Sequence, residues 1–393
     1  MKLKTINQIK SLKNKTVLLR VDFNCPLKNN QITDQTRIKK VLPTIKYLLK
    51  QQARVILISH LGRPQGKWDS QYSLKPVARI LKKEFKDFSF ITTSILNPEI
   101  KKDLAKIKPG GGGLLENIRF YPREEKNCLR WAKKIASLGD IYINDAFAVC
   151  HRAHSSVAGI TKYRPSYAGF LLEQEVKELS QVLKKPRHPL VVVMGGKKII
   201  TKLGLIKHLL KKADQILIGG ALATNFLKAA GYQVGQSFYQ PDMIKKVIPL
   251  ISKKNLVLPC DFMVKSGTQV LKVNVGELNQ LKNNFKILDI GPASIKEFEK
   301  YFKNVKMIIW NGPLGYFEDS RFSQGTKKIA QAILKNKQAS VIVGGGETMA
   351  GLKKLTNYSA GRYPHLFISS GGGAMLDFLA GKDLPGIKNL IKT

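Results

Sequence analysis

The chain has 393 residues, which exceeds what one hydrophobic core usually supports and therefore predicts two domains. Hydrophobic residues make up 43% of the sequence, enough to fill two cores, so a disordered chain is excluded. The 67 lysines and arginines against 27 acidic residues give a net charge of +40. The lysines are scattered as short pairs and are not gathered into one stripe with aromatic residues. No specific nucleic-acid partner is therefore expected.

Short β-branched runs alternate with longer helical patterns along the chain. The runs predicted as strands are, in order, Val17–Phe23, Arg54–Ser59, Ile141–Asn144, Leu190–Met194, Gln215–Ile218, Leu256–Leu258, Lys286–Ile290, Met307–Trp310, Ser340–Val343 and Leu366–Ser369. The segments predicted as helices are Ile38–Gln51, Phe170–Lys184, Thr201–Lys212, Ala223–Ala230 and Thr326–Asn336. This repetition predicts an α/β fold of parallel sheets covered by helices, with ligands at the carboxyl ends of the strands.

The strand ends differ between the two halves of the chain. In the first half they carry polar and charged side chains: Asp22, Asn24, His60, Arg63, Arg119, Asp145, His151 and Arg152. In the second half they carry bare backbone: Gly195-Gly196, Gly219-Gly220, Gly291-Pro292, Gly312-Pro313 and Gly344-Gly345-Gly346, with Gly371–Gly373 opening the last helix. A helical segment separates the half with charged strand ends from the half with glycine strand ends, and it predicts the domain break near Ala168–Pro186.

Each kind of strand end suits a different ligand. Arginine forks orient a small, highly charged anion, whereas glycines before helices let nucleotide phosphates approach free N–H donors. A lone loop histidine or arginine is usually structural. Five such ends together, with Arg37 included, indicate a bound anion, because converging cations otherwise cost stability. The sequence therefore predicts an acidic metabolite in the first half and a nucleotide in the second.

Several common motifs are missing. Gly195–Lys202 resembles a phosphate loop but lacks the Walker A order, and no G-x-G-x-x-G follows the first strand of either half, which disfavours a dehydrogenase. Protein-kinase signatures and the G-x-S-x-G elbow are also absent.

The cysteines and the chain start bear on the compartment. The four cysteines (Cys25, Cys128, Cys150 and Cys260) lie far apart, which suggests reduced thiols. The first ten residues contain no apolar signal-peptide core, and no apolar run approaches a membrane span. A cytoplasmic protein with no membrane partner is expected.

Taken together, these segments resemble the phosphoglycerate kinase family along essentially the whole chain. The resemblance rests on Arg20–Pro26, Ser59–Pro64, Leu114–Phe120, Asn144–Ser156, Ala168–Val176, Gly195–Leu203, Ile218–Lys228, Leu258–Val264, Leu288–Ile295, Ile309–Glu318, Gly344–Thr348 and Ser369–Ile387. It implies two doubly wound (Rossmann-like) parallel-sheet domains joined by a hinge, in a monomer. The implied parts are an acidic-substrate domain (residues 1–169), a hinge helix (170–185), a nucleotide domain (186–369) and a tail packing back on the first domain (370–393).

The resemblance also implies the reaction. The family converts 1,3-bisphosphoglycerate and ADP, with Mg²⁺, to 3-phosphoglycerate and ATP. Carried over, Asp22 and Asn24 bind the glycerate end, and Arg37 contacts the reacting carboxyl and the transferred phosphoryl group. The residues implied to hold the non-transferred phosphate, or to lie beside it, are His60, Arg63, Arg119, His151 and Arg152.

In the second half, the resemblance implies that Lys198 and Lys202 contact the nucleotide phosphates and the transferring group. The nucleotide-binding residues implied are Gly195, Gly196, Lys202, Gly219, Gly220, Asn311, Glu318, Gly344, Gly345, Gly346 and Thr348, with Glu347 as the Mg²⁺ ligand. Phosphoryl transfer requires charge neutralisation and alignment and no covalent catalyst, which fits these residue types.

The chain departs from the family pattern in five places. Glu347 and Thr201 stand where the family usually has aspartate, and Ala221 replaces a glycine. Ala148–Cys150 replaces a glycine-rich run, and Gly111–Gly113 stands in a strand position, which should weaken that strand.

Two other hypotheses stay open from the sequence alone. A degenerate relative kept as a basic binding protein for nucleic acid or membrane surfaces would account for the charge and for Glu347. A nicotinamide dehydrogenase is disfavoured by the missing fingerprint.

Overall fold

The computed structural model describes residues 1–359 and 361–392, and these form two compact units. Unit 1 comprises Met1–Ser180 and the C-terminal residues from Asp383 onward, and unit 2 comprises Gln181–Lys382. Helix α5 (Phe170–Lys184) covers the segment expected as the hinge, and the division between the units falls inside it. Of the tail expected from residue 370, helix α12 (Gly372–Leu379) belongs to unit 2.

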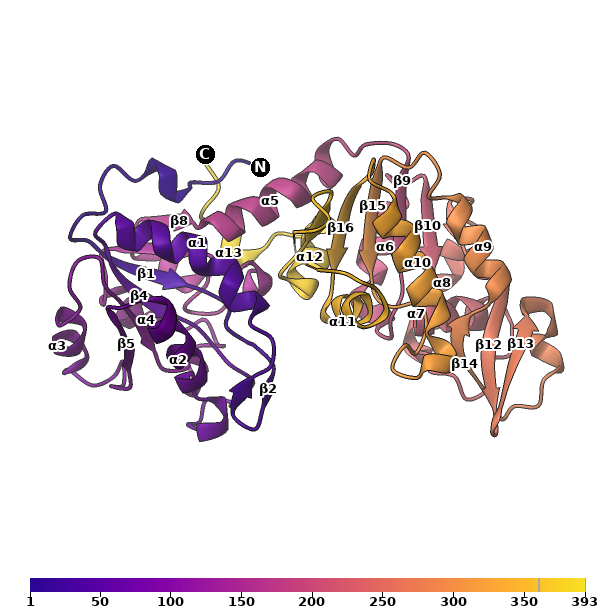
Figure 1. Cartoon of the computed structure of the whole chain (residues 1–393), viewed down its shortest axis with the longest axis horizontal. Helices are drawn as coiled ribbons and strands as arrows, with labels where there is room; N and C mark the ends of the chain where they lie inside the picture. The colour runs from indigo at the N-terminus through magenta and orange to yellow at the C-terminus, as the bar shows by residue number, and fades with distance from the viewer. Residues whose placement is uncertain (360, 393) are drawn as a thin grey trace. The chain divides into compact units, whose positions relative to one another are not determined.

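Unit 1 is built on a six-stranded parallel sheet with the order β5-β6-β4-β1-β7-β8 (Figure 1). The strands are β1 (Thr16–Arg20), β4 (Arg54–Ile58), β5 (Phe88–Ile91), β6 (Gly112–Leu115), β7 (Ile141–Asn144) and β8 (Ser166–Ala168). The helices are α1 (Thr36–Lys50), α2 (Lys75–Glu84), α3 (Ile100–Ala105) and α4 (Leu129–Ala136), and a short hairpin is formed by β2 (Leu27–Lys28) and β3 (Gln31–Ile32).

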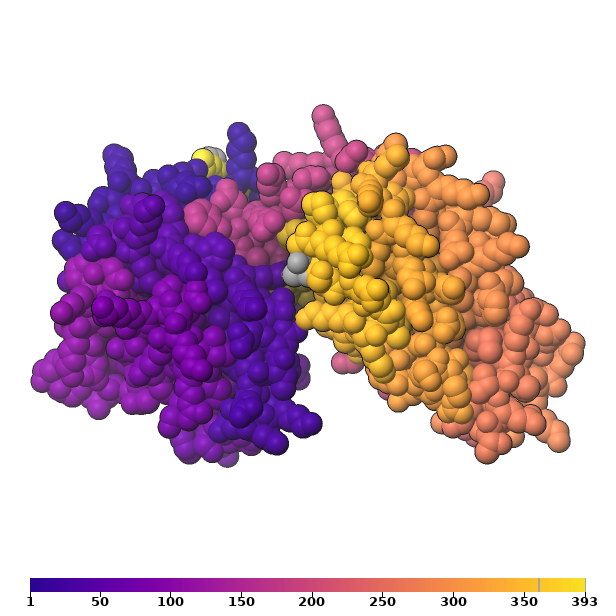
Figure 2. Space-filling view, viewed as in Figure 1, coloured from indigo at the N-terminus to yellow at the C-terminus, as the bar shows by residue number. Residues whose placement is uncertain are grey.

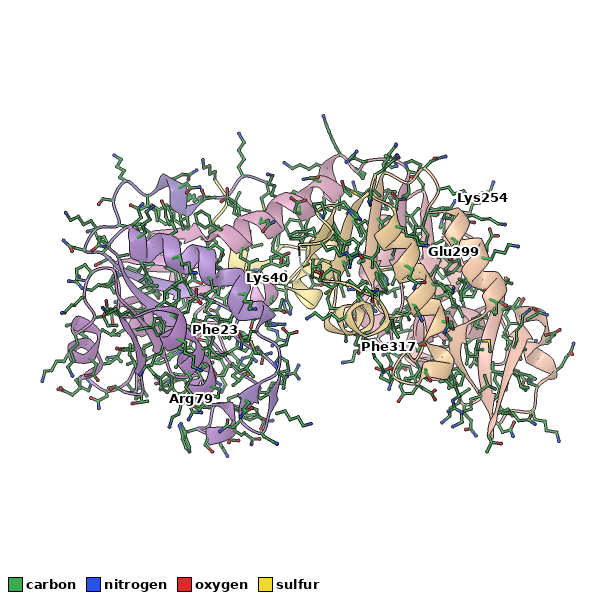
Figure 3. The ribbon with its side chains drawn as sticks, viewed as in Figure 1. Phe23, Lys40, Arg79, Lys254, Glu299 and Phe317 are labelled. Carbon is green, nitrogen blue, oxygen red and sulfur yellow. The ribbon has the colours of Figure 1, made fainter. Side chains whose placement is uncertain are left out.

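Alternation along the strands explains why helices cover both faces of this sheet. Val17 and Leu19 of β1 pack in the cluster that contains the buried residues of α1 and α2. Leu18 packs in the opposite cluster, with the buried residues of α3 and α4. Because successive side chains point to opposite faces, one strand serves two cores. Phe23 points into the first of them (Figure 3).

The glycine run in β6 does not prevent the strand from forming. β6 pairs with β4 on one side and β5 on the other. A Cβ built on Gly113 would lie 2.6 Å from Cδ1 of Ile91 and 2.8 Å from Cδ1 of Ile107, and one on Gly112 would lie 2.9 Å from the ring of Phe88. Large neighbours therefore occupy the space that side chains at these positions would otherwise fill, so the expected weakening is offset by packing.

Unit 2 contains the second six-stranded parallel sheet, with the order β11-β10-β9-β15-β16-β17. The strands are β9 (Leu190–Met194), β10 (Gln215–Ile218), β11 (Leu256–Val257), β15 (Met307–Asn311), β16 (Ser340–Gly344) and β17 (Leu366–Ile368). The helices besides α12 are α6 (Leu203–Leu209), α7 (Gly220–Ala229), α8 (Pro241–Ile251), α9 (Pro292–Lys300), α10 (Gln324–Lys335) and α11 (Gly346–Leu355). The two parallel sheets confirm the predicted α/β fold class.

One predicted strand belongs to a different sheet. β14 (Phe285–Ile290) covers the predicted Lys286–Ile290, but it pairs antiparallel with β12 (Asp261–Ser266), which pairs antiparallel with β13 (Gln269–Asn274). Gly267, with φ +58°, allows the tight turn between β12 and β13. The prediction that the Gly291-Pro292 end lies with the parallel-strand ends is therefore wrong.

Gly291 has another purpose in this sheet. A Cβ on it would lie 2.3 Å from the carboxyl carbon of Asp261, whose oxygens accept the N–H groups of Ala293 (3.0 Å) and Ser294 (2.7 Å) at the start of α9. The glycine makes room for a carboxylate that caps a helix.

The two ends of the chain pair with each other in unit 1. The Lys4 N–H donates to the Leu390 carbonyl (2.7 Å), and the Lys392 N–H donates to the Lys2 carbonyl (2.9 Å). The C-terminal residues emerge beside the N-terminal ones (Figure 2). Helix α13 (Pro385–Lys388) precedes this pairing, and the Gly386 carbonyl accepts the side-chain amide of Asn144 (2.9 Å).

The basic surface is spread over the elements of both units. Most helices carry lysine in the last turn, for example Lys50 in α1, Lys184 in α5 and Lys335 in α10, where a cation complements the helix dipole. Arg79 and Lys254 project from the surfaces of their units (Figure 3). Among the described residues, no helix is both long and apolar enough to span a membrane.

Candidate active site

The sheet order of unit 1 brings the predicted anion-site segments to one edge. β6, β4, β1 and β7 are neighbours, and all four run in parallel, so the residues that follow them meet at the carboxyl edge of the sheet. Asp22 follows β1, His60 follows β4, Arg119 follows β6 and His151 follows β7.

Asp22 organises the part of this edge next to β1. Arg37, from the first turn of α1, forms an ion pair with its Oδ2, and the Asn24 N–H donates to its Oδ1 (3.0 Å). Nδ1 of His60 lies 3.8 Å from the same Oδ1. Asn24 in turn accepts the Gly62 N–H through its side-chain oxygen (2.9 Å). The glycerate-end residues are thus tied to Arg37 and to the loop after β4.

Arg119 is a buried cation with an unused donor. Its side chain is only 4% exposed, and Nη1 donates to the Gly62 carbonyl (2.8 Å). Nε lies 3.0 Å from Oε1 of Glu125, an ion pair without hydrogen-bond alignment, and Nη2 has no hydrogen-bond partner among the described residues. Burial lowers its pKa to about 10, with Arg20 and Arg152 acting in the same direction and Glu125 opposing. A buried guanidinium donor without a partner is costly unless an acceptor is supplied, and an anion supplies one.

The segment after β7 adds imidazoles and a further arginine. Nε of Arg152 donates to Nε2 of His151 (3.3 Å), so these two predicted site residues lie together. His154 is buried beside them, and burial, reinforced by Arg119, Arg20 and Arg152, lowers its pKa to about 3. His154 is therefore a neutral ring within the cation cluster.

Sequence reasoning missed His154 and Arg20 as members of the cluster. Arg20 ends β1 and is fully buried, and its Nη2 lies 3.3 Å from Nδ1 of His60. Its signal was a charged residue inside an otherwise apolar strand, where burial demands a partner. His154 carried only the weak signal of a third polar residue soon after Arg152.

Arg63 is a predicted anion-site residue whose side chain makes no polar contact with the described residues of the cation cluster. Its side chain is exposed and makes no hydrogen bond or ion pair with the described residues. Its predicted contact with phosphate stays a prediction.

A groove of about 500 Å³ opens beside the cation cluster. It is lined by Asn24, Leu27, Leu61, Gly62, Gln71 and Tyr72, among others. None of its lining residues is cationic, so it adjoins the anion site and does not itself neutralise a phosphate.

The loops of unit 2 also converge at one sheet edge, since β10, β9, β15 and β16 are neighbours. The Gly196 N–H donates to the Pro313 carbonyl (2.7 Å), and the Gly220 N–H donates to the Leu314 carbonyl (2.8 Å). A Cβ on Gly195 would lie 2.0 Å from the Pro313 oxygen. These glycines are needed for the loops to pack on one another, whatever they bind.

Gly346 differs from these glycines because a Cβ on it would meet nothing within 4 Å. It begins α11, after Gly345 at φ +99°. Open space over the free N–H groups of a helix start suits the close approach of a phosphate.

Asn311 and Thr348 hold the shape of these loops. The Asn311 side-chain amide donates to the Gly344 carbonyl (2.8 Å), and the Thr348 hydroxyl donates to the same carbonyl (2.8 Å) and accepts the Gly312 N–H (2.7 Å). Both side chains are buried. In this structure they act as supports for the loops that carry the predicted nucleotide contacts.

Lys202 and Glu347 flank Gly196. Nζ of Lys202 donates to the Gly195 carbonyl, and burial lowers the lysine pKa to about 8, with Glu347 opposing. A Cβ on Gly196 would lie 2.8 Å from Nζ of Lys202 and 3.5 Å from Oε2 of Glu347. The buried Lys202 ammonium and the exposed Glu347 carboxylate at the start of α11 therefore both lie next to Gly196.

This donor set fits a magnesium ion that arrives with a nucleotide. Mg²⁺ is usually held by one or two carboxylates and by substrate phosphates, and Glu347 offers one carboxylate. The described residues contain no group of three or more His, Cys, Asp and Glu side chains able to hold a metal by themselves.

Lys198 and Glu318 are exposed at the ends of these loops. The Glu318 carbonyl accepts Nζ of Lys354 (3.1 Å), which ties its backbone to α11. The Lys198 side chain makes no hydrogen bond or ion pair with the described residues, so its phosphate contact stays a prediction.

One unit carries a cluster of cations at the carboxyl edge of its sheet, which suits a small anion. The other unit carries glycine loops at the same edge of its own sheet, which suit a nucleotide. This combination defines the class of two-domain phosphotransferases. The family model described as phosphoglycerate kinase matches residues 6–382. The chain belongs to the phosphoglycerate kinase family, and its function is that of a glycolytic kinase with a carboxyl group as acceptor.

The relatives agree along the whole chain. It is 46% identical over 398 residues to a phosphoglycerate kinase of Pseudothermotoga lettingae (99% of each chain covered) and 42% identical over 406 residues to one of Borreliella afzelii (100% of each). The solved phosphoglycerate kinase of Coxiella burnetii matches with a TM-score of 0.85 at 39% identity, covering 99% of each chain. That of Pyrococcus horikoshii matches with a TM-score of 0.84 at 29% identity, covering 99% of this chain and 98% of its own.

Proposed function

We propose that the protein catalyses reversible, Mg²⁺-dependent phosphoryl transfer from 1,3-bisphosphoglycerate to ADP, giving 3-phosphoglycerate and ATP. The observation that carries the proposal is Arg119, a guanidinium 4% exposed with a donor that no described residue satisfies, in a cluster of further cations. A multiply charged anion would satisfy that donor and stabilise the converging cations.

In unit 1, the non-transferred phosphate is held by His60, Arg63, Arg119 and Arg152, with His151 beside them. Asp22 and Asn24 bind the glycerate hydroxyl and carboxyl end. Arg37 contacts the reacting carboxyl group, and its ion pair with Asp22 supports this role because it fixes the guanidinium next to the glycerate residues.

In unit 2, the nucleotide phosphates approach the start of α11 at Gly346, and Lys202 neutralises the transferring group. With a pKa of about 8, Lys202 is still protonated at neutral pH. Glu347 would hold the Mg²⁺ ion, which when bound supplies charge neutralisation between the nucleotide phosphates.

The reaction breaks the P–O bond of the acyl phosphate and forms a P–O bond to the terminal oxygen of ADP. Neither step needs a protein nucleophile or a general base, so cations and helix N–H groups account for the chemistry. The two half-sites belong to different units, and direct transfer requires that the units bring them together and exclude water.

The same proposal places the enzyme in the cytoplasm as a monomer. Four free cysteines, at Cys25, Cys128, Cys150 and Cys260, support a reducing compartment. The spread of lysines over many helix ends supports a solvated surface over a dedicated polyanion site.

The experiment is a coupled assay of ATP formation from 1,3-bisphosphoglycerate, with Arg119→Ala as the diagnostic variant. Losing a buried charge-assisted contact costs roughly 2–5 kcal/mol, so the KM for 3-phosphoglycerate in the reverse reaction should rise about thirtyfold or more. The KM for ATP should stay nearly unchanged. An unaltered KM for 3-phosphoglycerate would remove Arg119 from the site, and absence of ATP formation by the wild-type protein would overturn the proposed function.

A further inference from the structure

We propose that Arg20 is a positioning residue that fixes the tautomer of His60, holding Nδ1 as a hydrogen-bond acceptor so that Nε2 carries the proton and is the ring's donor to the acidic substrate. This inference rests on the proposed function of the unit 1 site, and Arg20 itself does not contact the substrate.

The direction of the bond follows from donor chemistry. Nη2 of Arg20 lies 3.3 Å from Nδ1 of His60, and a guanidinium has donors but no acceptor. Nδ1 must therefore offer its lone pair to this bond. In a neutral imidazole the proton then sits on Nε2.

Asp22 is the competing partner of Nδ1, and the geometry disfavours it. Its Oδ1 is 3.8 Å from Nδ1, beyond hydrogen-bond distance. The carboxylate is already paired with Arg37 and accepts the Asn24 N–H.

The charges around His60 keep the ring neutral. Burial lowers its pKa well below the usual range, and the nearby Arg20, Arg119, Arg37 and His154 act in the same direction. A doubly protonated ring, which would lose the acceptor at Nδ1, is therefore disfavoured.

Arg20 can hold this position because it is itself held. It is fully buried, its Nε donates to the Ser156 hydroxyl (3.0 Å), and its Nη1 donates to the Val21 carbonyl. The Ser156 hydroxyl donates onward to Oε1 of the buried Glu124 (2.6 Å), whose Oε2 accepts the Ser156 N–H (3.1 Å). A fixed chain of bonds thus runs from Glu124 through Ser156 and Arg20 to His60, and a satisfied buried network of this kind sets one geometry.

The test begins with nitrogen NMR of His60 in the intact, ligand-free protein. The expected wild-type spectrum shows a protonated Nε2 and an unprotonated Nδ1. Arg20→Lys keeps the charge but loses the planar fork, so it should give mixed tautomers and raise the KM for 3-phosphoglycerate several-fold, with little change in the KM for ATP. Ser156→Ala, which leaves Arg20 in place but removes its anchor, should change the same quantities in the same direction and serves if the lysine variant does not fold.

A double-mutant cycle separates positioning from general damage. In a His60→Gln background, Arg20→Lys should add no further rise in the KM for 3-phosphoglycerate, because the ring through which it acts is gone. Tyr142→Phe is the matched control: the Tyr142 hydroxyl donates to the backbone carbonyl of Ser156 (2.8 Å), so its loss weakens the same buried region without touching the Arg20 bond.

A protonated Nδ1 in the wild-type protein, or additive effects in the cycle, would overturn the inference. Failure of the proposed function has a different signature. In that case the wild-type protein forms no ATP from 1,3-bisphosphoglycerate, while the His60 spectrum still shows a protonated Nε2 and an unprotonated Nδ1.

Discussion

Gly346 and the other loop glycines of unit 2 look alike in the sequence, yet their surroundings differ. Gly195 and Gly220 are crowded by the backbone of the Pro313 loop, whereas Gly346 faces open space at the start of α11. Gly346→Ala should therefore leave stability within about 0.5 kcal/mol, since an exposed substitution that meets nothing is usually neutral. Nucleotide affinity should fall at least tenfold, because the methyl group blocks the approach of phosphate to the helix start.

Gly276→Ala is the matched control for this measurement, since a Cβ there also meets nothing within 4 Å. ADP binding by calorimetry and unfolding by urea give the two quantities. Unchanged ADP affinity in the Gly346 variant would place the phosphates elsewhere.

Glu347 is the departure from the family pattern that the structure makes most informative. It lies beside Lys202, and its negative charge opposes the burial that lowers that lysine's pKa. A shorter aspartate suits the near-ideal octahedral geometry of Mg²⁺ better, so Glu347→Asp should lower the magnesium concentration for half-maximal activity. Glu347→Ala should reduce turnover about a hundredfold, in line with losing one preorganised electrostatic group.

Magnesium titrations of activity and of ADP binding measure both effects. Glu299→Asp, an exposed change on α9, is the control. Full activity of the alanine variant at low magnesium would show that Glu347 is not a metal ligand.

At the scale of elements, three of the described helices share one feature: a buried aspartate carboxylate accepts N–H groups at the helix start. Each aspartate lies in a strand or directly after one. The pairs are Asp145 with α5, Asp261 with α9 and Asp289 with α10, and a glycine makes room for each carboxylate, namely Gly169, Gly291 and Gly325. Acceptors at a helix start satisfy its orphan N–H groups. A glycine after a strand is thus explained by a cap as readily as by a ligand, which is why the sequence alone assigned Gly291 wrongly.

Asp145 makes this cap sensitive to pH. Its Oδ1 accepts the Leu172 N–H (3.0 Å) in the first turn of α5, and burial raises its pKa from 3.8 to about 7, opposed by Thr44 and by the Leu172 and Leu171 N–H groups. Because the folded pKa is above the unfolded one, the associated stability is present in acid and lost as pH rises through about 7. Asp145→Asn stays neutral, so the wild-type protein should lose stability relative to it as pH rises from about 4 to about 7, the interval between the unfolded and the folded pKa.

The loss is at most about 4 kcal/mol, at about 1.4 kcal/mol per pH unit. Urea unfolding of both proteins at several pH values measures it, with Asp87→Asn as an exposed control. A stability difference that does not change across this range would show that the Asp145 pKa is close to that of the unfolded chain.

Most elements of the two parallel sheets could be predicted because β-branched runs and helical periodicity agree there with the fold. The predicted strands did not include β5, β6 or β8. In β6 the space beside the glycines is filled by Ile91, Ile107 and Phe88, which no local pattern shows. The anion site was anticipated from the polar strand ends. Arg20 was overlooked as a site residue because its importance lies in bonds to Ser156 and His60, which are distant in the sequence.

At the scale of the whole molecule, the proposed reaction predicts a motion. With the two substrates assigned to different units, neither substrate alone should close the enzyme fully, and both together should compact it, because only the ternary complex offers contacts from both half-sites. Small-angle scattering in the four ligation states measures the radius of gyration. Arg119→Ala, which should bind 3-phosphoglycerate about thirtyfold more weakly and therefore stay open at the same substrate concentration, is the control. One radius in all four states would contradict the hinge mechanism.

The pairing of the two chain ends has a consequence for synthesis. Most of unit 1 precedes unit 2 in the chain, but the residues that pair with Lys2 and Lys4 and accept the Asn144 amide are made after unit 2. The Gly386 N–H also donates to the Cys150 carbonyl (2.9 Å), directly before His151 and Arg152. Domains generally fold as units in the order in which they emerge. Here unit 1 includes residues that follow unit 2 in the chain, so its packing next to His151 and Arg152 is expected to be completed only after unit 2 has been made.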